Sequence, residues 1–243
     1  MRVAVITPYW HEPDRMLIRC LDSVAAQTHP CTHLMVADGH PNALIDRREA
    51  CIHLKLDQAH GDNGDTPRGI GAKCAIEMGF DAVAFLDADN WFWPNHIETL
   101  VALQAESGAE VLISKRSFHR ADGSEILGLA EAGDAVHYAD TSCLMLTGRA
   151  LDIAPLWTAI PKELAPICDR IFWQMLMSHG YKMAVSPKRT VAFTTQYTAH
   201  YAAVGEPPPA QAKDGQESQA AVAWWNALPL EEQERLNRNM GFP

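Results

Sequence analysis

Short apolar runs alternate with longer amphipathic stretches along the first half of this chain. Runs of four to six mostly apolar residues are typical of strands buried on both faces, whereas apolar residues three or four positions apart are typical of helices. The runs that predict strands are Arg2–Thr7, Leu34–Ala37, Ile52–Leu56 and Val83–Leu86, and the stretches that predict helices are Asp14–Gln27, Ala72–Met78 and Asn95–Glu106, with a loop at His60–Gly71.

This alternation predicts an α/β domain with a mainly parallel sheet and helices on both faces. The second half is less regular. We expect one domain over residues 1–205, in halves 1–110 and 111–205, followed by a loop and helical tail at 206–243. The remaining predicted strands are Val111–Lys115, Ser142–Thr147, Tyr181–Val185 and Thr190–Thr194. The remaining predicted helices are Arg149–Trp157, Asp169–His179 and Ala220–Leu236, the last interrupted at Pro229. The segment Arg120–Asp134 is predicted as a hairpin or a flexible loop.

Polar residues stand at the ends of three predicted strands. They are Thr7-Pro8, Asp38-Gly39 and Asp87-Ala88-Asp89. In sheets of this kind, ligands bind at the carboxyl ends of the strands. The pattern therefore predicts that these three segments converge on one crevice.

Asp87 and Asp89 suggest a cation site. Side chains alternate along a strand, so both carboxylates would point the same way if the extended geometry persisted. Two such charges repel unless a cation lies between them, and Mg²⁺ is commonly held by one or two carboxylates together with substrate phosphates. The alternative is that these residues only form a turn, where Asp and Asn are common. Asp-x-Asp alone does not separate the two interpretations.

Composition narrows the classes of function. Acidic residues outnumber basic ones 30 to 20, for a net charge of −10, which argues against nucleic-acid binding. The six cysteines include no Cys-x-x-Cys pair, which disfavours structural zinc and suits reduced thiols in a cytosolic protein. The first apolar run ends at Pro8, too early for a signal peptide, and no window approaches the roughly 18 apolar residues of a membrane span. We expect a soluble, cytoplasmic protein without a transmembrane segment.

Four sequence blocks together resemble a known family. They are VAVITPYW, LMVADGHPN, PRGIGAKCA and VAFLDADNWFWP, in this order within residues 2–200. This series resembles the GT-A glycosyltransferases, and most closely the inverting enzymes of family 2. The resemblance implies a GT-A fold, a Rossmann-like α/β architecture with a mixed, mainly parallel sheet. It also implies that residues 1–110 bind a nucleotide and that residues 111–205 bind the acceptor.

The resemblance assigns roles on the nucleotide side. Thr7 and Pro8 would bracket the base, Asp38 would recognise uracil, and Arg68 would clamp the diphosphate or the base region. UDP is therefore the expected nucleotide. The alternatives are a plain strand-to-loop turn, an Asp-Gly turn and a solvent-exposed arginine. The family's Asn after the arginine is replaced here by Gly69, so any side-chain contact from that position is lost.

The resemblance also assigns the metal site and the sugar-nucleotide contacts beside it. Asp87, in the same motif as Ala88, would contact the ribose or metal-bound water. Asp89 would ligate Mn²⁺ or Mg²⁺, and His200 would be a further ligand. A lone histidine is more often a surface or core residue, and that alternative stays open for His200.

Asp169 is the candidate catalytic base. An inverting transferase needs a group that takes the proton of the acceptor hydroxyl. In the family this is an acidic residue at a helix start, often in a Glu-Asp pair; here Asp169 matches the Asp and Cys168 replaces the Glu. The alternative is an aspartate that only caps its helix.

Together these features predict a metal-dependent glycosyltransferase that moves a sugar from a nucleotide-sugar, expected to be a UDP-sugar, to a hydroxyl acceptor with inversion. The acceptor could be a glycan, a lipid-linked sugar or a small molecule. One alternative is a nucleotidyltransferase, which would normally carry a Gly-rich basic loop after the first strand, where this chain has TPYWHEPD. The other is a non-catalytic member that binds a nucleotide-sugar, an interpretation kept open by Gly69 and Cys168.

Overall fold

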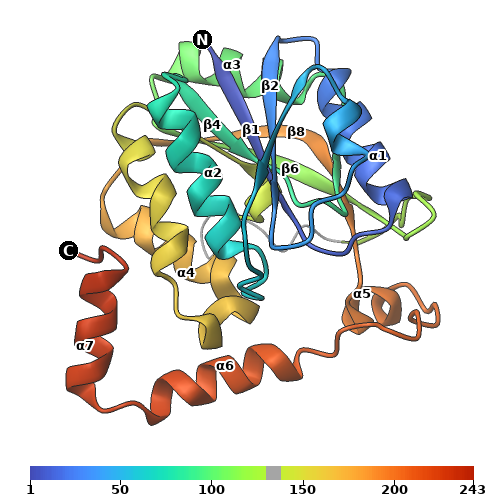
Figure 1. The fold of residues 1–243 in the computed structure, drawn as a ribbon. Helices are drawn as coiled ribbons and strands as arrows, with labels where there is room; N and C mark the ends of the chain where they lie inside the picture. The colour runs from blue at the N-terminus through green and yellow to red at the C-terminus, as the bar shows by residue number, and fades with distance from the viewer. Residues whose placement is uncertain (130–137) are drawn as a thin grey trace.

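A mixed eight-stranded sheet forms the centre of the molecule (Figure 1). The computed structural model describes residues 1–129 and 138–243. The strands lie in the order β3-β2-β1-β4-β7-β6-β8-β5. Their bounds are β1 Val3–Tyr9, β2 Cys31–Ala37, β3 Cys51–Lys55, β4 Ala82–Phe85, β5 Trp91–Phe92, β6 Val111–His119, β7 Leu144–Thr147 and β8 Met183–Thr194.

The sheet is mainly parallel, as predicted. Strand β1 pairs in parallel with β2 and β4, and β2 pairs in parallel with β3. Strand β7 is antiparallel to both β4 and β6, β6 is parallel to β8, and β5 is antiparallel to β8. Only β5 and β7 therefore run against the others in the described part of the chain. Strands β1, β2, β3, β4, β6 and β8 all end at one edge, which we call the carboxyl edge.

Helices cover both faces of the sheet (Figure 1). The alternation of side chains along β1 shows how. Ile6 points to one face and contacts Gly71 of α2, while the neighbouring Thr7 points to the other, where its Oγ1 lies 3.8 Å from Cys20 Sγ of α1. Helices α2 (Asp65–Glu77) and α4 (Cys168–Ser178) thus lie on one side, and α1 (Asp14–Ala25) and α3 (His96–Ser107) on the other.

The remaining helices are short or lie in the tail. The 3-10 helices are η1 (Ile45–Arg47), η2 (Thr141–Cys143), η3 (Gly148–Ala159) and η4 (Lys162–Ile167). Helices α5 (Thr198–Ala203), α6 (Gln216–Ala227) and α7 (Leu230–Asn239) form an arm that runs along one end of the domain (Figure 1). Trp224 and Trp225 of α6 pack against the main core and anchor the arm.

Stacked aromatic rings hold η3 and α4 onto the sheet. The rings of Trp157 in η3 and Phe172 in α4 stack with centroids 3.9 Å apart, and Phe85 of β4 meets Trp157 edge to face at 5.9 Å. All three side chains are fully buried. Aromatic pairs of this kind contribute about 0.5–1.5 kcal/mol beyond the burial of their surface. This packing fixes the start of α4, where Asp169 lies, relative to the end of β4.

Two sequence-based boundaries were wrong, and a third predicted element is a different type of helix. Helix α2 begins at Asp65, inside the predicted loop His60–Gly71, because its glycines allow close packing that their low helix propensity conceals. The predicted strands Tyr181–Val185 and Thr190–Thr194 belong to one strand, β8, whose pairing with β6 shifts register midway. The predicted helix Arg149–Trp157 is a 3-10 helix that contains Pro155.

The predicted hairpin or loop at Arg120–Asp134 lies only partly within the described residues. His119 and Glu125 form an antiparallel bridge, which makes the start of this segment a tight hairpin. Its residues from 130 onward lie outside the described part.

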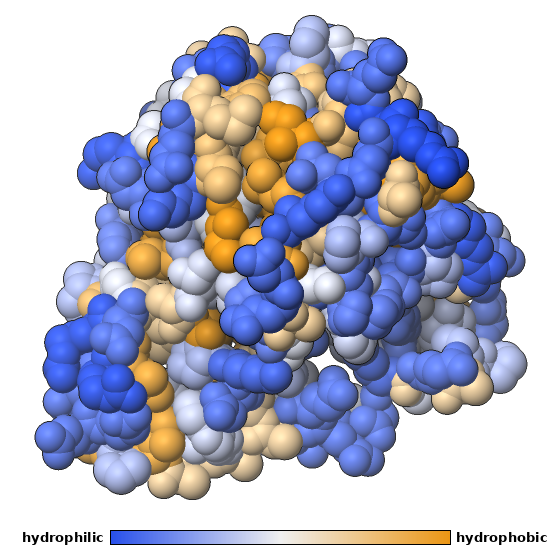
Figure 2. All heavy atoms as spheres, viewed as in Figure 1, coloured by the Kyte–Doolittle hydropathy of each residue, from blue (hydrophilic) through white to orange (hydrophobic). Residues whose placement is uncertain are grey.

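Hydrophilic residues dominate the face seen in Figure 2, and hydrophobic atoms gather over the sheet between α1 and α2. Across the described residues, the helices are too short or too polar for any of them to cross a membrane.

Two buried histidines make the fold sensitive to acid. Burial lowers the pKa of His33 and His96 to about 3. An unfolded histidine titrates near 6.5. Below that pH the unfolded chain binds protons that the folded protein does not, so each histidine removes stability as the pH falls. The slope is about 1.4 kcal/mol per pH unit for each histidine.

We therefore expect His96→Gln to flatten this dependence. Glutamine does not titrate and can keep the hydrogen bond that His96 Nδ1 makes with Thr190 Oγ1 at 2.8 Å. Between pH 6 and 4 the free energy of unfolding of the variant should rise relative to wild type by about 1.4 kcal/mol per pH unit. Urea denaturation at several pH values measures this, with exposed His40→Gln as the control. Parallel profiles for wild type and His96→Gln would contradict it.

Candidate active site

The chain turns sharply after β4, so Asp87 and Asp89 do not continue the strand. The turn is closed by a hydrogen bond from Asn90 N to Asp87 O of 3.0 Å. The two carboxylates consequently reach different partners: Asp87 accepts from Arg68, and Asp89 accepts from Gln196 Nε2 at 3.2 Å. The extended backbone on which a common direction of the two carboxylates depended is therefore absent after β4. They nevertheless remain close enough for the charge of Asp87 to raise the pKa of Asp89.

Both halves of the chain hold this turn. The Asp89 carbonyl accepts from Arg19 Nη2 of α1 at 3.0 Å and from the Thr194 hydroxyl of β8 at 2.5 Å. The guanidinium of Arg19 also lies over the Trp91 ring, 3.9 Å from its centroid. Ala88, between the two aspartates, is buried in the apolar cluster that contains Leu17 and Leu21. The aspartates thus stand on a backbone that neighbouring elements fix in place.

Four carboxylates gather beside this turn: Asp87, Asp89, Asp140 and Asp169. We call them the acidic cluster. Burial, with the charges of Asp87, Glu12 and Asp140, raises the pKa of Asp89 to about 7. Burial also raises the pKa of Asp140 to about 6, although its ion pair with Arg116 opposes this, and burial raises the pKa of Asp169. A group of carboxylates that resists ionisation in this way would be stabilised by a bound cation.

Arg68 is a buried bridge between two carboxylates rather than an exposed arginine. Its Nη1 donates to Asp65 Oδ1 at 2.8 Å, and its Nη2 donates to Asp87 Oδ1 at 2.9 Å. Its guanidinium also lies 4.6 Å from the centroid of the Trp157 ring. Burial would lower the pKa of Arg68, but the Asp87 and Asp65 charges outweigh it and raise that pKa. Arg68 therefore carries a permanent positive charge directly behind the acidic cluster.

Gly69, which follows Arg68, is packed tightly against η3. A Cβ on Gly69 would lie 2.6 Å from Thr158 Cγ2 and 2.7 Å from the carbonyl oxygen of Pro155, both in η3. The space that an asparagine side chain would need is thus filled by η3. Close packing of α2 against η3 is thus a structural reason for a glycine at this position.

We accordingly expect Gly69→Ala to destabilise the protein. Overpacking of this kind costs roughly 1–3 kcal/mol, to be measured as a loss in the free energy of unfolding in urea. Lys73→Ala, on the exposed side of the same helix, is the control and should change stability little. Adding Thr158→Ser removes the Cγ2 clash and should restore part of the loss, because the Pro155 carbonyl remains. If Gly69→Ala had the same free energy of unfolding as wild type, η3 would be able to move away from the new Cβ at no measurable cost.

The residues predicted to read the nucleotide base lie together at the carboxyl edge, but their side chains face the protein. Thr7 Oγ1 lies 2.8 Å from His33 Nε2, and the Pro8 ring lies against Gly64. The Asp38 carboxylate accepts from His60 N, from His60 Nδ1 at 2.8 Å and from Gly61 N. In this structure Asp38 thus holds the loop before α2. Base recognition by these residues stays a prediction.

Asp169 lies in the first turn of α4 without capping it. The N-cap position belongs to Ile167, and the Asp169 carboxylate accepts from the backbone N of Arg170 at 2.8 Å. The charges of Asp87 and Asp140 are within electrostatic reach. The preceding Cys168 bonds to the side chain of Asp65. The capping alternative is therefore wrong for Asp169, and its carboxylate belongs to the acidic cluster.

His200 is not brought into a metal-binding group. Its Nδ1 lies 2.6 Å from Thr195 Oγ1 in the segment before α5, and its ring meets the Phe118 ring edge to face. Across residues 1–129 and 138–243, no three His, Cys, Asp or Glu side chains are arranged to hold a metal ion by themselves. The role of His200 as a ligand stays a prediction.

Sequence reasoning missed several site residues. Arg116 and Asp140 form a buried ion pair, and Gln196 bonds to Asp89. Ser142 Oγ accepts from Asp87 N at 3.2 Å and from Asn90 Nδ2 at 3.1 Å. Only Arg116 left a signal, as a charged residue close to the apolar run Val111–Ile113 of β6. The others follow strands or loops whose position depends on the fold.

The donor set suits a divalent cation that also contacts a ligand. Mg²⁺ usually takes only one or two carboxylates from the protein and completes its shell with water and substrate phosphates. Asp87 and Asp89 would supply these carboxylates. Asp87 Oδ1 accepts from Arg68 and Asp89 Oδ2 accepts from Gln196, whereas Asp87 Oδ2 accepts only a long hydrogen bond of 3.4 Å from Ser142 Oγ among the described residues. The residues present therefore fit such an ion together with a diphosphate.

Comparisons with known proteins resolve the fold. No family model matches the sequence, and no curated protein matches it. A structure of TarS from S. aureus, a GT-A-like glycosyltransferase, matches at a TM-score of 0.62 and 16% identity, covering 100% of this chain but 44% of that chain. This chain thus spans less than half of the length of that TarS chain.

Shorter TarS structures match as well. TarS 1–349 in complex with UDP matches at a TM-score of 0.63 and 14% identity, covering 99% of this chain and 80% of that chain. The complex with UDP-GlcNAc matches at 0.55 and 13% identity, covering 98% and 79%. At these identities the likeness concerns the fold. The chain accordingly has the GT-A-like architecture that its sequence predicts.

Proposed function

We propose that this protein is a glycosyltransferase that moves a sugar from a UDP-sugar to the hydroxyl of an acceptor. The acidic cluster at the carboxyl edge of a GT-A sheet is the observation that supports this most strongly. In this proposal Asp87 and Asp89 hold the cation and the diphosphate, and Asp169, whose pKa responds to the charge of Asp87, is the base. The TarS structures in complex with UDP and UDP-GlcNAc support the same class of donor.

A divalent cation, Mn²⁺ or Mg²⁺, is part of this proposal. Asp89 would hold it directly, with Asp87 contributing to the same site or to the ribose. When bound, such an ion offsets negative charge on the departing diphosphate. Arg68 adds a fixed positive charge behind Asp87.

The proposed transfer proceeds with inversion. The acceptor oxygen forms a bond to the anomeric carbon of the sugar as the bond from that carbon to the diphosphate oxygen breaks. The proton of the acceptor hydroxyl goes to Asp169, and UDP leaves with the bonding electron pair. Burial raises the pKa of Asp169, so its carboxylate is a better proton acceptor than an exposed aspartate.

Two alternatives are less well supported. A nucleotidyltransferase would need a basic Gly-rich loop after β1, whereas the segment Tyr9–Pro13 contains neither glycine nor lysine nor arginine. A non-catalytic nucleotide-sugar-binding protein was suggested by Gly69 and Cys168. The packing of Gly69 against η3 weakens that suggestion, because it gives this glycine a structural cause.

The proposal is tested by incubating the protein with UDP-GlcNAc or UDP-glucose, with Mn²⁺, Mg²⁺ or EDTA, and measuring the UDP released. We expect metal-dependent release that a suitable acceptor accelerates. Binding without release would favour the non-catalytic alternative. Absence of both binding and release for UDP-sugars and GDP-sugars would refute the proposal.

A further inference from the structure

Asp65 is a buried carboxylate to which the proposed reaction gives no role. It lies in the first turn of α2, and its side chain is only 1% exposed. Arg68 Nη1 donates to its Oδ1 at 2.8 Å, and the thiol of Cys168, the first residue of α4, donates to its carboxylate as well. Asp65 thus joins the start of α2 to the start of α4.

The direction of the Arg68 guanidinium depends on Asp65. Nη1 donates to Asp65, Nη2 donates to Asp87 Oδ1 at 2.9 Å, and Nε has no hydrogen-bond partner among the described residues. The Trp157 ring beside it carries no negative charge that could take the place of a carboxylate. Without Asp65, both Nη groups would be free to pair with Asp87, which is the geometry that arginine and carboxylate prefer. Asp65 thus keeps Arg68 on one oxygen of Asp87.

That single contact leaves the other oxygen of Asp87 available to a ligand. Asp87 Oδ2 accepts only a long hydrogen bond of 3.4 Å from Ser142 Oγ among the residues that the structure describes. Asp65 also shares the charge of Arg68, which would otherwise be balanced by Asp87 alone and would weaken the attraction of Asp87 for a cation. The Arg68 and Asp65 side chains are almost fully buried, so salt and water screen this balance little.

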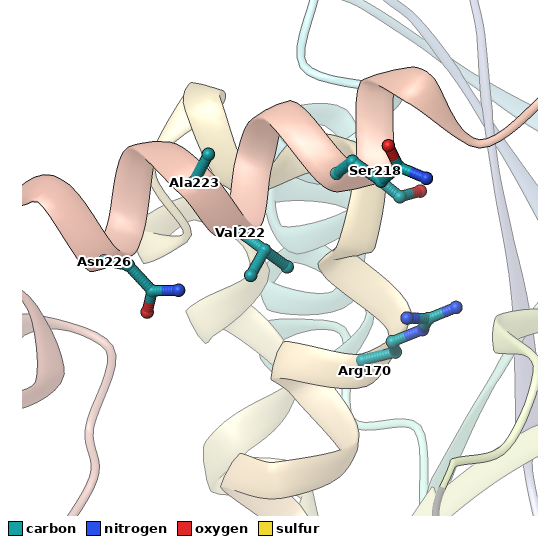
Figure 3. Close-up of a pocket in the computed structure, with 6 residues that line it drawn as sticks. Arg170, Ser218, Val222, Ala223 and Asn226 are labelled. Carbon is teal, nitrogen blue, oxygen red and sulfur yellow. The ribbon is translucent and has the colours of Figure 1, made fainter.

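The start of α4 is held in place independently of Asp65. Helix α6 lies across it, with a groove between the two helices that is lined in part by Arg170, Ser218 and Val222 (Figure 3). Ser218 Oγ donates to the Pro166 carbonyl oxygen of η4 at 3.3 Å. A side chain at position 168 therefore starts from a fixed backbone.

Position 168 is close enough to Arg68 for a longer acid to take the place of Asp65. The Cys168 thiol contacts the Asp65 carboxylate, and the charge of Arg68 acts on that thiol. The carboxylate of a glutamate would lie one carbon beyond the position of the sulfur, toward the space that the Asp65 carboxylate fills. Glutamate is the residue that the family resemblance places at position 168. In this chain the acid beside Arg68 thus comes from α2 and not from α4.

We propose that Asp65 is a positioning residue of the donor site, supplying from α2 the carboxylate that Cys168 of α4 lacks. It holds Arg68 against Asp87 Oδ1 and so leaves Asp87 Oδ2 to the cation and the diphosphate. This role rests on the glycosyltransferase function proposed above and extends it to a residue that acts on the donor through Arg68 and Asp87. It also gives a reason for Cys168 that does not require a non-catalytic protein.

Titration calorimetry of UDP with Mn²⁺ or EDTA tests this role in wild type, Asp65→Asn and Asp62→Asn. Asparagine at position 65 keeps the shape of the side chain but not its charge. We expect Asp65→Asn to weaken the affinity for UDP in Mn²⁺ roughly 10-fold or more, as is typical for residues that orient metal ligands, with no change in EDTA. Asp62→Asn is the matched control, because Asp62 accepts from Thr66 N at the start of the same helix. It should bind UDP as wild type does.

An exchange of the acid between the two helices separates positioning from general support of the fold. Asp65→Ala should lose affinity for UDP in Mn²⁺ as Asp65→Asn does, and Asp65→Ala/Cys168→Glu should regain most of that loss. A purely structural role at the start of α2 would not respond to an acid on α4. The crystal structure of the double variant should show the introduced carboxylate paired with Arg68 Nη1. Thermal denaturation shows whether each variant is folded, and if Asp65→Ala is not, Asp65→Asn and its control decide.

Equal affinities of wild type and Asp65→Asn in Mn²⁺, or an equal loss in Asp62→Asn, overturn the role of Asp65 and leave the proposed function standing. Failure of the double variant to regain affinity although its carboxylate reaches Arg68 overturns that role as well. If wild type binds UDP with Mn²⁺ but releases none from UDP-sugars, the transferase is refuted and the affinities still decide on Asp65. If wild type binds no UDP, both proposals are refuted.

Discussion

Replacing Asp89 by alanine is expected to abolish metal-supported binding of UDP without weakening the fold. Under the proposed function Asp89 holds the cation directly, so its loss should reduce the affinity for UDP in Mn²⁺ by roughly 100-fold or more, about 2.7 kcal/mol. Affinity in EDTA should not change. Calorimetric titration of UDP with and without Mn²⁺ measures both.

Thermal stability separates this effect from damage to the structure. The pKa of Asp89 is raised to about 7, so its folded form binds a proton more readily than its unfolded form. The stability it contributes is present at low pH and is lost as the pH rises through 7. At pH 8, Asp89→Ala should therefore match or exceed wild type in Tm. Asp152→Ala, an exposed aspartate of η3, is the control for binding. Unchanged UDP affinity in Mn²⁺ would refute the assignment of Asp89.

Replacing Asp169 by asparagine is expected to remove the base while leaving the donor site intact. Asparagine is nearly isosteric and can still accept from Arg170 N, but it cannot take a proton. General-base catalysis contributes roughly 10²–10⁴-fold, so kcat for transfer should fall by about that factor. The affinity for UDP-sugar should stay within about twofold of wild type. Single-turnover transfer to the acceptor that most accelerates the release of UDP measures the chemical step.

The pH dependence gives an independent readout. Burial raises the pKa of Asp169, so the rate in wild type should fall on acidification at a pH above the usual range of an aspartate. The Asp169→Asn variant should lack that limb. Glu163→Gln, an exposed acid in the neighbouring η4, should keep it. Transfer by Asp169→Asn at close to the wild-type rate would assign the proton to another group.

The sequence predicted the architecture well because burial on both faces leaves a clear apolar signal in β1, β2 and β4. It failed where close packing reverses local preference. Gly69 and Gly71 have low helix propensity and so indicate a loop, yet both lie in α2. Glycine is needed at these positions because η3 and the surface of β1 and β2 approach the helix backbone too closely for a side chain. Strand β8 was divided in two because its pairing changes register near Lys115 of β6, which depends on the partner strand.

The candidate site was predicted in part. Asp87, Asp89 and Asp169 do gather at one edge, since strand ends and a helix start can be located from local pattern. Their partners could not be found in that way. Arg116 and Asp140 are 24 positions apart, and Gln196 is 107 positions from Asp89. Such contacts arise from the way β7 and β8 enter the sheet, which leaves little trace in short stretches of sequence.

The support of the Asp89 turn by both halves of the chain has a consequence for how the protein is made. Strand β5 pairs only with β8 among the described residues. The Asp89 carbonyl can accept the hydrogen bond from the Thr194 hydroxyl only when β8 is in place. Contacts so far apart form late, because the chain between them must close first. During synthesis, β1 to β4 can assemble well before residue 194 leaves the ribosome. The sheet is thus able to form early, whereas the site becomes complete only when most of the chain has been synthesised.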